Sequence, residues 1–99
     1  MNYEWDTVKN IGNIRKHKVS FEQAISALED PHSLFLYDEA HSQYEDRYIV
    51  IGYAEGLVLF VNEVEIAEDT MRVISARVAN KKEKEAYYGN SALYFGNRT

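Results

Sequence analysis

The spacing of apolar residues predicts two short helices in the first 30 residues. The first helix should begin after Asp6, which is a good N-cap, and end near Lys16. Its apolar stripe has three-residue spacing and is expected to face the core: Val8, Ile11 and Ile14. Its polar side is expected to hold Lys9, Asn13 and Lys16.

The second helix has clear start and stop signals. Ser20 and Gln23 fit a capping box, and Phe21, Ala24, Ile25 and Leu28 form one helical stripe. Asp30 precedes Pro31, which ends the helix because a residue before proline avoids the α region. Residues 17–19 are a short connection, so the two helices should pack as a close pair.

Beyond residue 33 the pattern becomes strand-like. We predict strands over residues 34–37, 47–53, 57–66 and 71–78, and residues 3–5 can add an edge strand. The turns after residues 54 and 67 are short, so the strands they join must be antiparallel neighbours. Asn80 can cap a final helix to about Tyr88, which Gly89 and Asn90 can stop, and the last nine residues are expected to be weakly ordered.

These elements predict one α+β domain over residues 1–99. It should contain an antiparallel sheet of about four strands, two N-terminal helices and a C-terminal helix. The helices can cover one face of the sheet and leave the other face free.

Composition limits the chemistry and the location of the protein. The chain contains no cysteine, which excludes disulfides, thiolate metal sites and a cysteine nucleophile. The N-terminus lacks the form of a signal peptide, and no apolar run approaches the roughly 20 residues that span a bilayer. We expect a soluble, cytoplasmic protein with no membrane partner.

The charge is distributed unevenly. The net charge is -5, but residues 21–46 hold seven acids and no lysine or arginine, whereas residues 70–99 hold six basic side chains against two acids. Residues 1–20 hold four basic side chains against two acids. Because local fields steer a polyanion, the basic ends keep nucleic acid open as a partner.

No metal or phosphate-binding motif stands out. His17, His32 and His41 lack zinc-ligand spacing, and although acids surround the last two, loop histidines in an acidic segment explain them as well. The glycines stand alone, so no phosphate-binding loop is present. We expect no cofactor and no metal.

The strand predicted over residues 71–78 contains two arginines, Arg72 and Arg77. Alternation places side chains 72, 74 and 76 on one sheet face and 71, 73, 75 and 77 on the other, so Arg72 and Arg77 should face opposite sides. Arg47 heads a neighbouring strand. Guanidinium groups suit phosphate, but the two strand-end arginines, Arg72 and Arg77, can instead pair with Glu45, Asp46 or Glu63.

A second basic group covers residues 15–18. It contains His17, whose unperturbed pKa suits acid–base work, although cations at a helix C-terminus are also favoured by the helix dipole. Glu63 and Glu65 lie on one strand face, where such acids are usually solvated.

Three segments, in order, resemble the BrnT family of bacterial toxins: EWDTVKNIGNIRKHKVSFEQA at 4–24, EDRYIVIG at 45–52 and RVISARVANKKEKEAYY at 72–88. The resemblance implies a RelE-like fold and a ribonuclease toxin of a type II toxin–antitoxin module that arrests growth. It implies neutralisation by a BrnA-type antitoxin, operator DNA binding only through the antitoxin complex, and a dimer or a heterotetramer with the antitoxin. Lys18 stands where the family usually has glycine, and Val64 replaces a common basic residue.

For this activity we expect metal-independent cleavage, in which the RNA 2′-hydroxyl attacks its own phosphate. Arg72 and Arg77 are assigned to the phosphate charge, and His17 or Glu63 to the base. Substrate binding is assigned to Lys9, Lys16, Arg47, Lys81 and Tyr87. The alternatives are a non-catalytic module that only binds its antitoxin and a DNA-binding regulator acting alone.

Overall fold

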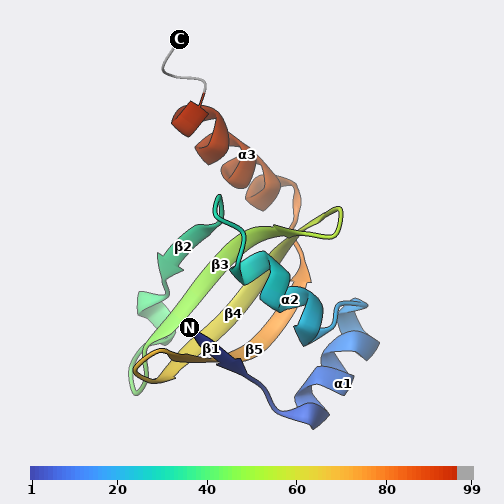
Figure 1. The fold of residues 1–99 in the computed structure, drawn as a ribbon, viewed down its shortest axis with the longest axis vertical. Helices are drawn as coiled ribbons and strands as arrows, with labels where there is room; N and C mark the ends of the chain where they lie inside the picture. The colour runs from blue at the N-terminus through green and yellow to red at the C-terminus, as the bar shows by residue number, and fades with distance from the viewer. Residues whose placement is uncertain (96–99) are drawn as a thin grey trace.

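Five strands form one sheet in the computed structural model, in the spatial order β1-β5-β4-β3-β2 (Figure 1). The structure describes the backbone of residues 1–95 and the side chains of residues 1–89. The antiparallel strands are β2 (Leu34–Tyr37), β3 (Arg47–Ala54), β4 (Leu57–Ala67) and β5 (Thr70–Val78). The short β1 (Asn2–Glu4) adds to β5 in parallel. The predicted α+β class is confirmed, with five strands in place of about four.

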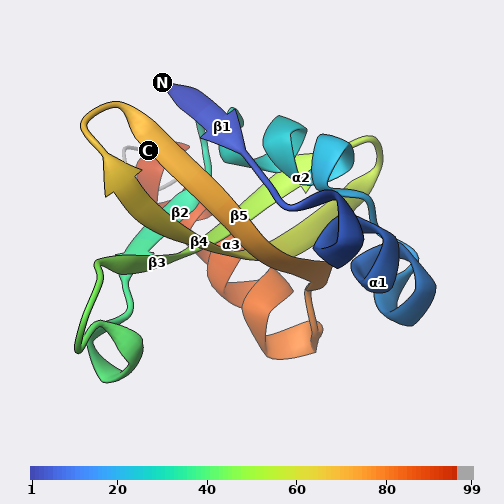
Figure 2. The same ribbon diagram turned by 90° about the horizontal axis from the view of Figure 1, so that it is seen from below.

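The helices lie on both sides of the sheet. Helices α1 (Thr7–His17) and α2 (Phe21–Leu28) lie on one side, and α3 (Lys81–Phe95) lies on the other (Figure 2). The main core lies beneath α2, where Phe21, Leu59 and Val61 are fully buried. The expectation that the helices share one face is therefore wrong for α3, because Tyr87 packs with Ile51 on the opposite face.

The apolar stripe predicted to face the core lies on the exposed side of helix α1. Val8, Ile11 and Ile14 are 77%, 51% and 41% exposed, whereas Asn10 and Asn13 are buried. Helical spacing shows which residues share a face but not which face turns inward. Hydrogen bonding decides the orientation here, because buried backbone groups need partners.

Asn13 supplies those partners to β5. Its amide nitrogen donates to the carbonyls of Val19 at 2.8 Å and Ala76 at 2.7 Å, and its Oδ1 accepts from the Ala76 N–H at 3.1 Å. Strand β1 covers only Thr70–Arg72, so one asparagine replaces the missing strand beside Ala76.

The short connection after α1 contains a left-handed residue. Lys18 has φ 61° and ψ 26°, and its N–H donates to the Ile14 carbonyl at 2.8 Å. Glycine adopts this C-terminal conformation without strain, whereas a side chain costs on the order of 1 kcal/mol. Lys18 therefore carries the strain expected of a non-glycine residue at positive φ.

Small residues bring α2 close to the sheet. A Cβ atom at Gly52 would lie 2.1 Å from the Ala27 carbonyl oxygen, so only glycine fits under the helix at this position. Ala24 and Ala27 are fully buried at the same contact.

Helix α3 is longer than expected. Asn80 and Glu83 form a reciprocal capping box, with both hydrogen bonds at 2.8 Å, as predicted for the N-cap. Gly89 keeps ordinary helical geometry and does not stop the helix, which continues to Phe95. The expectation of weak order at the chain end lies, for residues 96–99, outside the described residues. Within the described part of the chain, no helix is long and apolar enough to span a membrane.

Candidate functional site

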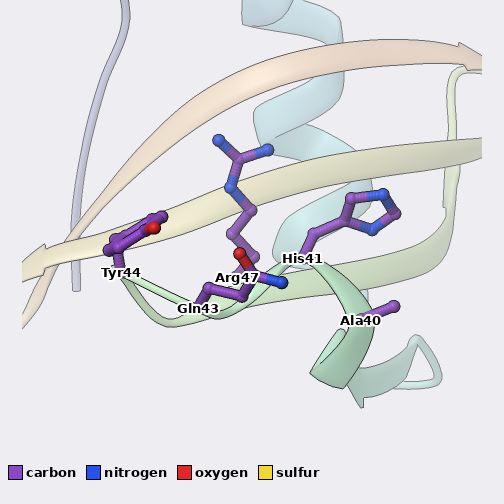
Figure 3. A pocket seen from close by; sticks show the side chains of 5 residues that line it. All are labelled: Ala40, His41, Gln43, Tyr44 and Arg47. Atoms are coloured by element: carbon purple, nitrogen blue, oxygen red, sulfur yellow. The ribbon is translucent and has the colours of Figure 1, made fainter.

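A groove lies on the sheet face opposite α1 and α2. It has a volume of about 380 Å³ and contains strand and loop residues: Asp38, His41, Arg47, Ile49, Phe60, Asn62, Ile74 and Ser75. A second hollow of about 300 Å³ adjoins it and shares His41 and Arg47. Figure 3 shows Arg47 rising from the start of β3 beside His41 from the short helix η1 (Glu39–His41).

The strand register builds the floor of this groove. Ile49, Asn62 and Ser75 are neighbours in one row across β3, β4 and β5, and the Asn62 amide donates to Ser75 Oγ at 2.9 Å. Arg47, Val64 and Arg72 form the row on one side, and Ile51, Phe60 and Arg77 form the row on the other. Cross-strand neighbours share a face, so all three arginines lie on the groove face of the sheet. Arg47 lines the groove itself, and Arg77 lies over Phe60, which also lines it.

A β-bulge brings Arg72 and Arg77 to one face. The β4–β5 register shifts between Asn62 and Glu63, which leaves Ile74 as an extra residue on β5. Val73 and Ala76 are both buried on the helix side, so Arg77 returns to the side of Arg72. The prediction that these two arginines face opposite sides is therefore wrong.

Each arginine already has a carboxylate partner. Arg72 bonds Glu4 at 2.6 and 2.8 Å, and Arg47 bonds Glu45 at 3.0 and 3.3 Å. The sequence suggested Glu45, Asp46 or Glu63 as partners of Arg72 and Arg77, and this is wrong for both, because Arg72 pairs with Glu4 and Arg77 pairs with Glu83. These pairs are half-exposed, where an ion pair contributes little, so a phosphate can compete for the guanidinium.

Arg77 is the most firmly held of the three. Its two terminal nitrogens donate to the two oxygens of Glu83 at 2.8 Å, and its guanidinium lies 4.2 Å from the centre of the Phe60 ring. The hydrogen bond to Glu83 raises the pKa of Arg77, so this charge is permanent. The arrangement fixes a planar cation at the α3 end of the groove.

A histidine–aspartate pair lies at the other end of the groove. His41 Nδ1 lies 2.9 and 3.1 Å from the two Asp38 oxygens, and His41 is exposed whereas Asp38 is largely buried. The Ser42 hydroxyl donates to the Asp38 carbonyl at 2.6 Å and accepts from the Arg47 N–H at 3.0 Å, which ties the loop to β3. A carboxylate on Nδ1 leaves Nε2 as the nitrogen that can exchange a proton.

A role for His41 in proton exchange was not predicted from the sequence. There, His41 was considered only as a metal ligand or as a loop residue in an acidic segment. Asp38 three residues before His41, and Arg47 six residues after it, are the signals that could have been used. Among the described residues, no group of three or more histidine or acidic side chains is placed to hold a metal ion.

The structure places Glu63 away from the groove. Glu63 is 3% exposed on the α2 side of β4, opposite Val73, and its Oε1 has no hydrogen-bond partner among the described residues. Burial raises the pKa of Glu63 to about 7. The sheet separates this carboxyl from the three arginines.

The other predicted site residues are dispersed. Lys9 and Lys16 are exposed on α1, and His17 is half-buried at the end of this helix, which packs on the other side of the sheet from the groove. Lys81 is exposed at the start of α3, three residues beyond Val78 at the end of β5. Tyr87 is 5% exposed and its hydroxyl donates to Asp30 at 2.5 Å, which is an anchor for α3 and leaves little ring surface for stacking.

Comparisons with known proteins agree with this fold. A family model described as the ribonuclease toxin BrnT of type II toxin–antitoxin systems matches residues 5–83. The 1.1 Å crystal structure of the Brucella abortus ribonuclease toxin BrnT superimposes with a TM-score of 0.58 and 25% sequence identity, covering 82% of this chain and 99% of that one. Among curated protein sequences, no relative matches the chain.

The fold and these matches define the class, which is a ribonuclease-toxin family of type II toxin–antitoxin systems. The chain belongs to the BrnT family. Membership implies that an antitoxin is its natural partner.

Proposed function

We propose that this chain is a metal-independent endoribonuclease that arrests bacterial growth and acts in the cytoplasm. The observation that carries the proposal is the placement of Arg47, Arg72 and Arg77 on the sheet face that holds the groove, with Arg47 and the His41–Asp38 pair lining it. RNA cleavage without a metal requires cations at the phosphate and groups that take up one proton and supply another, and the arginines and a proton-exchanging histidine can contribute to both.

The proposed reaction is an internal transfer of the phosphate. The 2′-oxygen bonds to the adjacent phosphorus while the bond from phosphorus to the 5′-oxygen breaks, which gives a 2′,3′-cyclic phosphate and a 5′-hydroxyl. One proton leaves the 2′-hydroxyl and one reaches the departing 5′-oxygen. The arginines stabilise the additional negative charge that forms on the phosphate oxygens.

We assign the general base to His41. His41 lines the groove, and Asp38 holds its Nδ1 at 2.9 Å, which leaves Nε2 as the nitrogen available to the RNA. Glu63 is buried on the opposite face and His17 lies on α1, so neither shares the groove with the arginines. Arg77 and Arg72 keep their assignment to phosphate charge, and Arg47, which lines the groove with His41, supports them.

We further propose that a BrnA-type antitoxin neutralises this activity, and that operator DNA is bound only through the toxin–antitoxin complex. The family assignment supports an antitoxin partner. The exposed arginine pairs support a site that either RNA or an acidic segment of the antitoxin can occupy.

One observation favours a second function. All three arginines are already paired with carboxylates, which is the state expected of a toxin that has lost catalysis and only binds its antitoxin. Expression of the wild-type chain in a bacterial host separates the two. The nuclease predicts growth arrest that the co-expressed antitoxin relieves, no arrest with His41→Ala, and full arrest with the control His32→Ala. Normal growth with the wild-type chain would favour the binding module.

A further inference from the structure

The outer edge of the sheet is formed by β2, and its surface is unusual for an exposed edge. The strand order places no described strand beyond β2. Phe35 and Tyr37 are 59% and 51% exposed, and Leu36 between them is also exposed. Natural proteins usually protect such edges with charges, proline or a covering element, because an open edge pairs with other chains.

Backbone hydrogen-bonding groups at this edge are available for pairing. The Asp38 N–H donates to the Arg47 carbonyl at 2.8 Å, which makes residues 38 and 47 a hydrogen-bonded pair. Hydrogen-bonded and non-hydrogen-bonded pairs alternate in an antiparallel ladder, so Leu36 bonds inward to β3. The N–H and C=O groups of Phe35 and Tyr37 therefore point outward.

An aromatic surface adjoins this edge. The Phe35 and Tyr48 rings stack with centroids 4.7 Å apart and an interplanar angle of 28°, and Tyr37 meets Tyr48 edge-on at 5.5 Å. Three aromatic rings in contact give an extended apolar contact area with little side-chain entropy left to lose. This surface lies on the α2 side of the sheet, away from the arginine groove.

Carboxylates border the rings. The Tyr37 hydroxyl donates to Asp46 at 3.0 Å, and the Tyr48 hydroxyl donates to Glu65 at 3.4 Å. Residues 21–46, which contain β2, carry seven acids and no lysine or arginine. An RNA strand would be repelled here, and a second copy of the chain would bring acids against acids.

We propose that the β2 edge binds an extended, basic segment of a partner protein. The segment adds a strand antiparallel or parallel to β2, places apolar side chains on Phe35 and Tyr48, and directs lysine or arginine side chains to Asp46 and Glu65. This inference does not depend on RNA cleavage, and a catalytically inactive chain would keep the site.

The test is a titration of the ¹⁵N-labelled full chain with a synthetic peptide that alternates valine with lysine. A peptide with glutamate in place of each lysine is the charge control. The basic peptide is expected to shift the amide signals of residues 34–37 and to bind at least about fivefold more tightly than the acidic one. Equal binding of both peptides, shifts confined to other strands, or no shift on β2 up to about 1 mM peptide would overturn the proposal.

Matched variants separate the contributions of charge and backbone. Asp46→Lys should weaken the basic peptide at least about fivefold, whereas Glu55→Lys, the same change at the other end of β3, should not. Tyr37→Pro removes an outward N–H without removing a bond to β3, whereas Tyr37→Ala removes only the ring. The basic peptide is therefore expected to bind Tyr37→Pro more weakly than Tyr37→Ala. If a single-stranded RNA shifts the same signals, or if they shift with protein concentration alone, the occupant is RNA or a second copy and the proposal fails.

Discussion

Arg72 and Arg77 lie on the same face of β5 although five positions separate them, because Ile74 is an extra residue opposite Asn62. Without a bulge, an odd separation would place them on opposite faces. The bulge also keeps Ala76 against Asn13, so one irregularity serves both the groove and the core.

Deletion of Ile74 tests this account of β5. After the deletion, simple alternation leaves Ser75 and Arg77 on the groove face and Ala76 inward, so the chain should fold with a loss of about 1 to 2 kcal/mol. Deletion of Val61 from the regular part of β4 should prevent folding, since it turns over every later side chain in the strand. Circular dichroism shows whether each deletion variant folds, and urea unfolding gives its free energy of unfolding. An equal loss of stability from the two deletions would contradict the bulge.

Asn13 should be more important for stability than the apolar stripe on the same helix. Asn13→Ala leaves both Ala76 backbone groups and the Val19 carbonyl without their side-chain partner, at a cost of about 3 kcal/mol. Ile11→Ala, at an exposed position, should change the free energy of unfolding by no more than about 0.5 kcal/mol. Urea unfolding of both variants gives the comparison, and a greater loss from Ile11→Ala would restore the predicted stripe as the buried face.

Glu63 should make the protein less stable as pH rises. Its folded pKa is about 7 against an ordinary value of 4.5, so the folded state binds the proton more tightly. The contribution to stability is fully present below pH 4.5 and is lost as pH rises through 7, with a size on the order of 2 kcal/mol. Glu63→Gln should be more stable than the wild type at pH 8 and should have nearly the same stability at pH 4.5. The free energy of unfolding of both proteins is measured across this pH range. If it changed with pH by the same amount in the two proteins, Glu63 would not be buried as described.

Tyr87 should contribute to stability and not to catalysis. Its hydroxyl bonds Asp30, where burial raises and this hydrogen bond lowers the carboxyl pKa, with a lowered value as the net result. Tyr87→Phe removes that bond to a charged group and should cost about 1.5 kcal/mol. RNA cleavage measured below the unfolding temperature should be unchanged within about twofold. A large loss of cleavage in a folded variant would return Tyr87 to the substrate site.

Local signals in the sequence were enough for most elements. Asp6, Ser20 and Asn80 cap their helices as predicted, and β2 has the predicted ends. These features depend on residues close together in the chain. The parallel pairing of β1 with β5 and the orientation of α1 depend on partners about 60 residues away, such as Asn13 and Ala76, which periodicity does not contain.

The candidate site could be predicted only in part, because it also depends on partners far away in the sequence. Arg47, Arg72 and Arg77 could be selected from residue type, but their common face depends on a bulge that ordinary alternation hides. His41 was passed over because its role comes from the fold, which ties its loop to β3 through Ser42 and brings it beside Arg47.

The most direct test of the groove is cleavage of an end-labelled single-stranded RNA by the purified protein in EDTA. The wild type and Arg15→Ala, a control on the exposed side of α1, should cleave the RNA. Arg77→Ala and His41→Ala should remain folded by circular dichroism and cleave at least about 100-fold more slowly. Cleavage by folded Arg77→Ala at the wild-type rate, or cleavage by the wild type only when a divalent metal is restored, would contradict a metal-independent site at this groove.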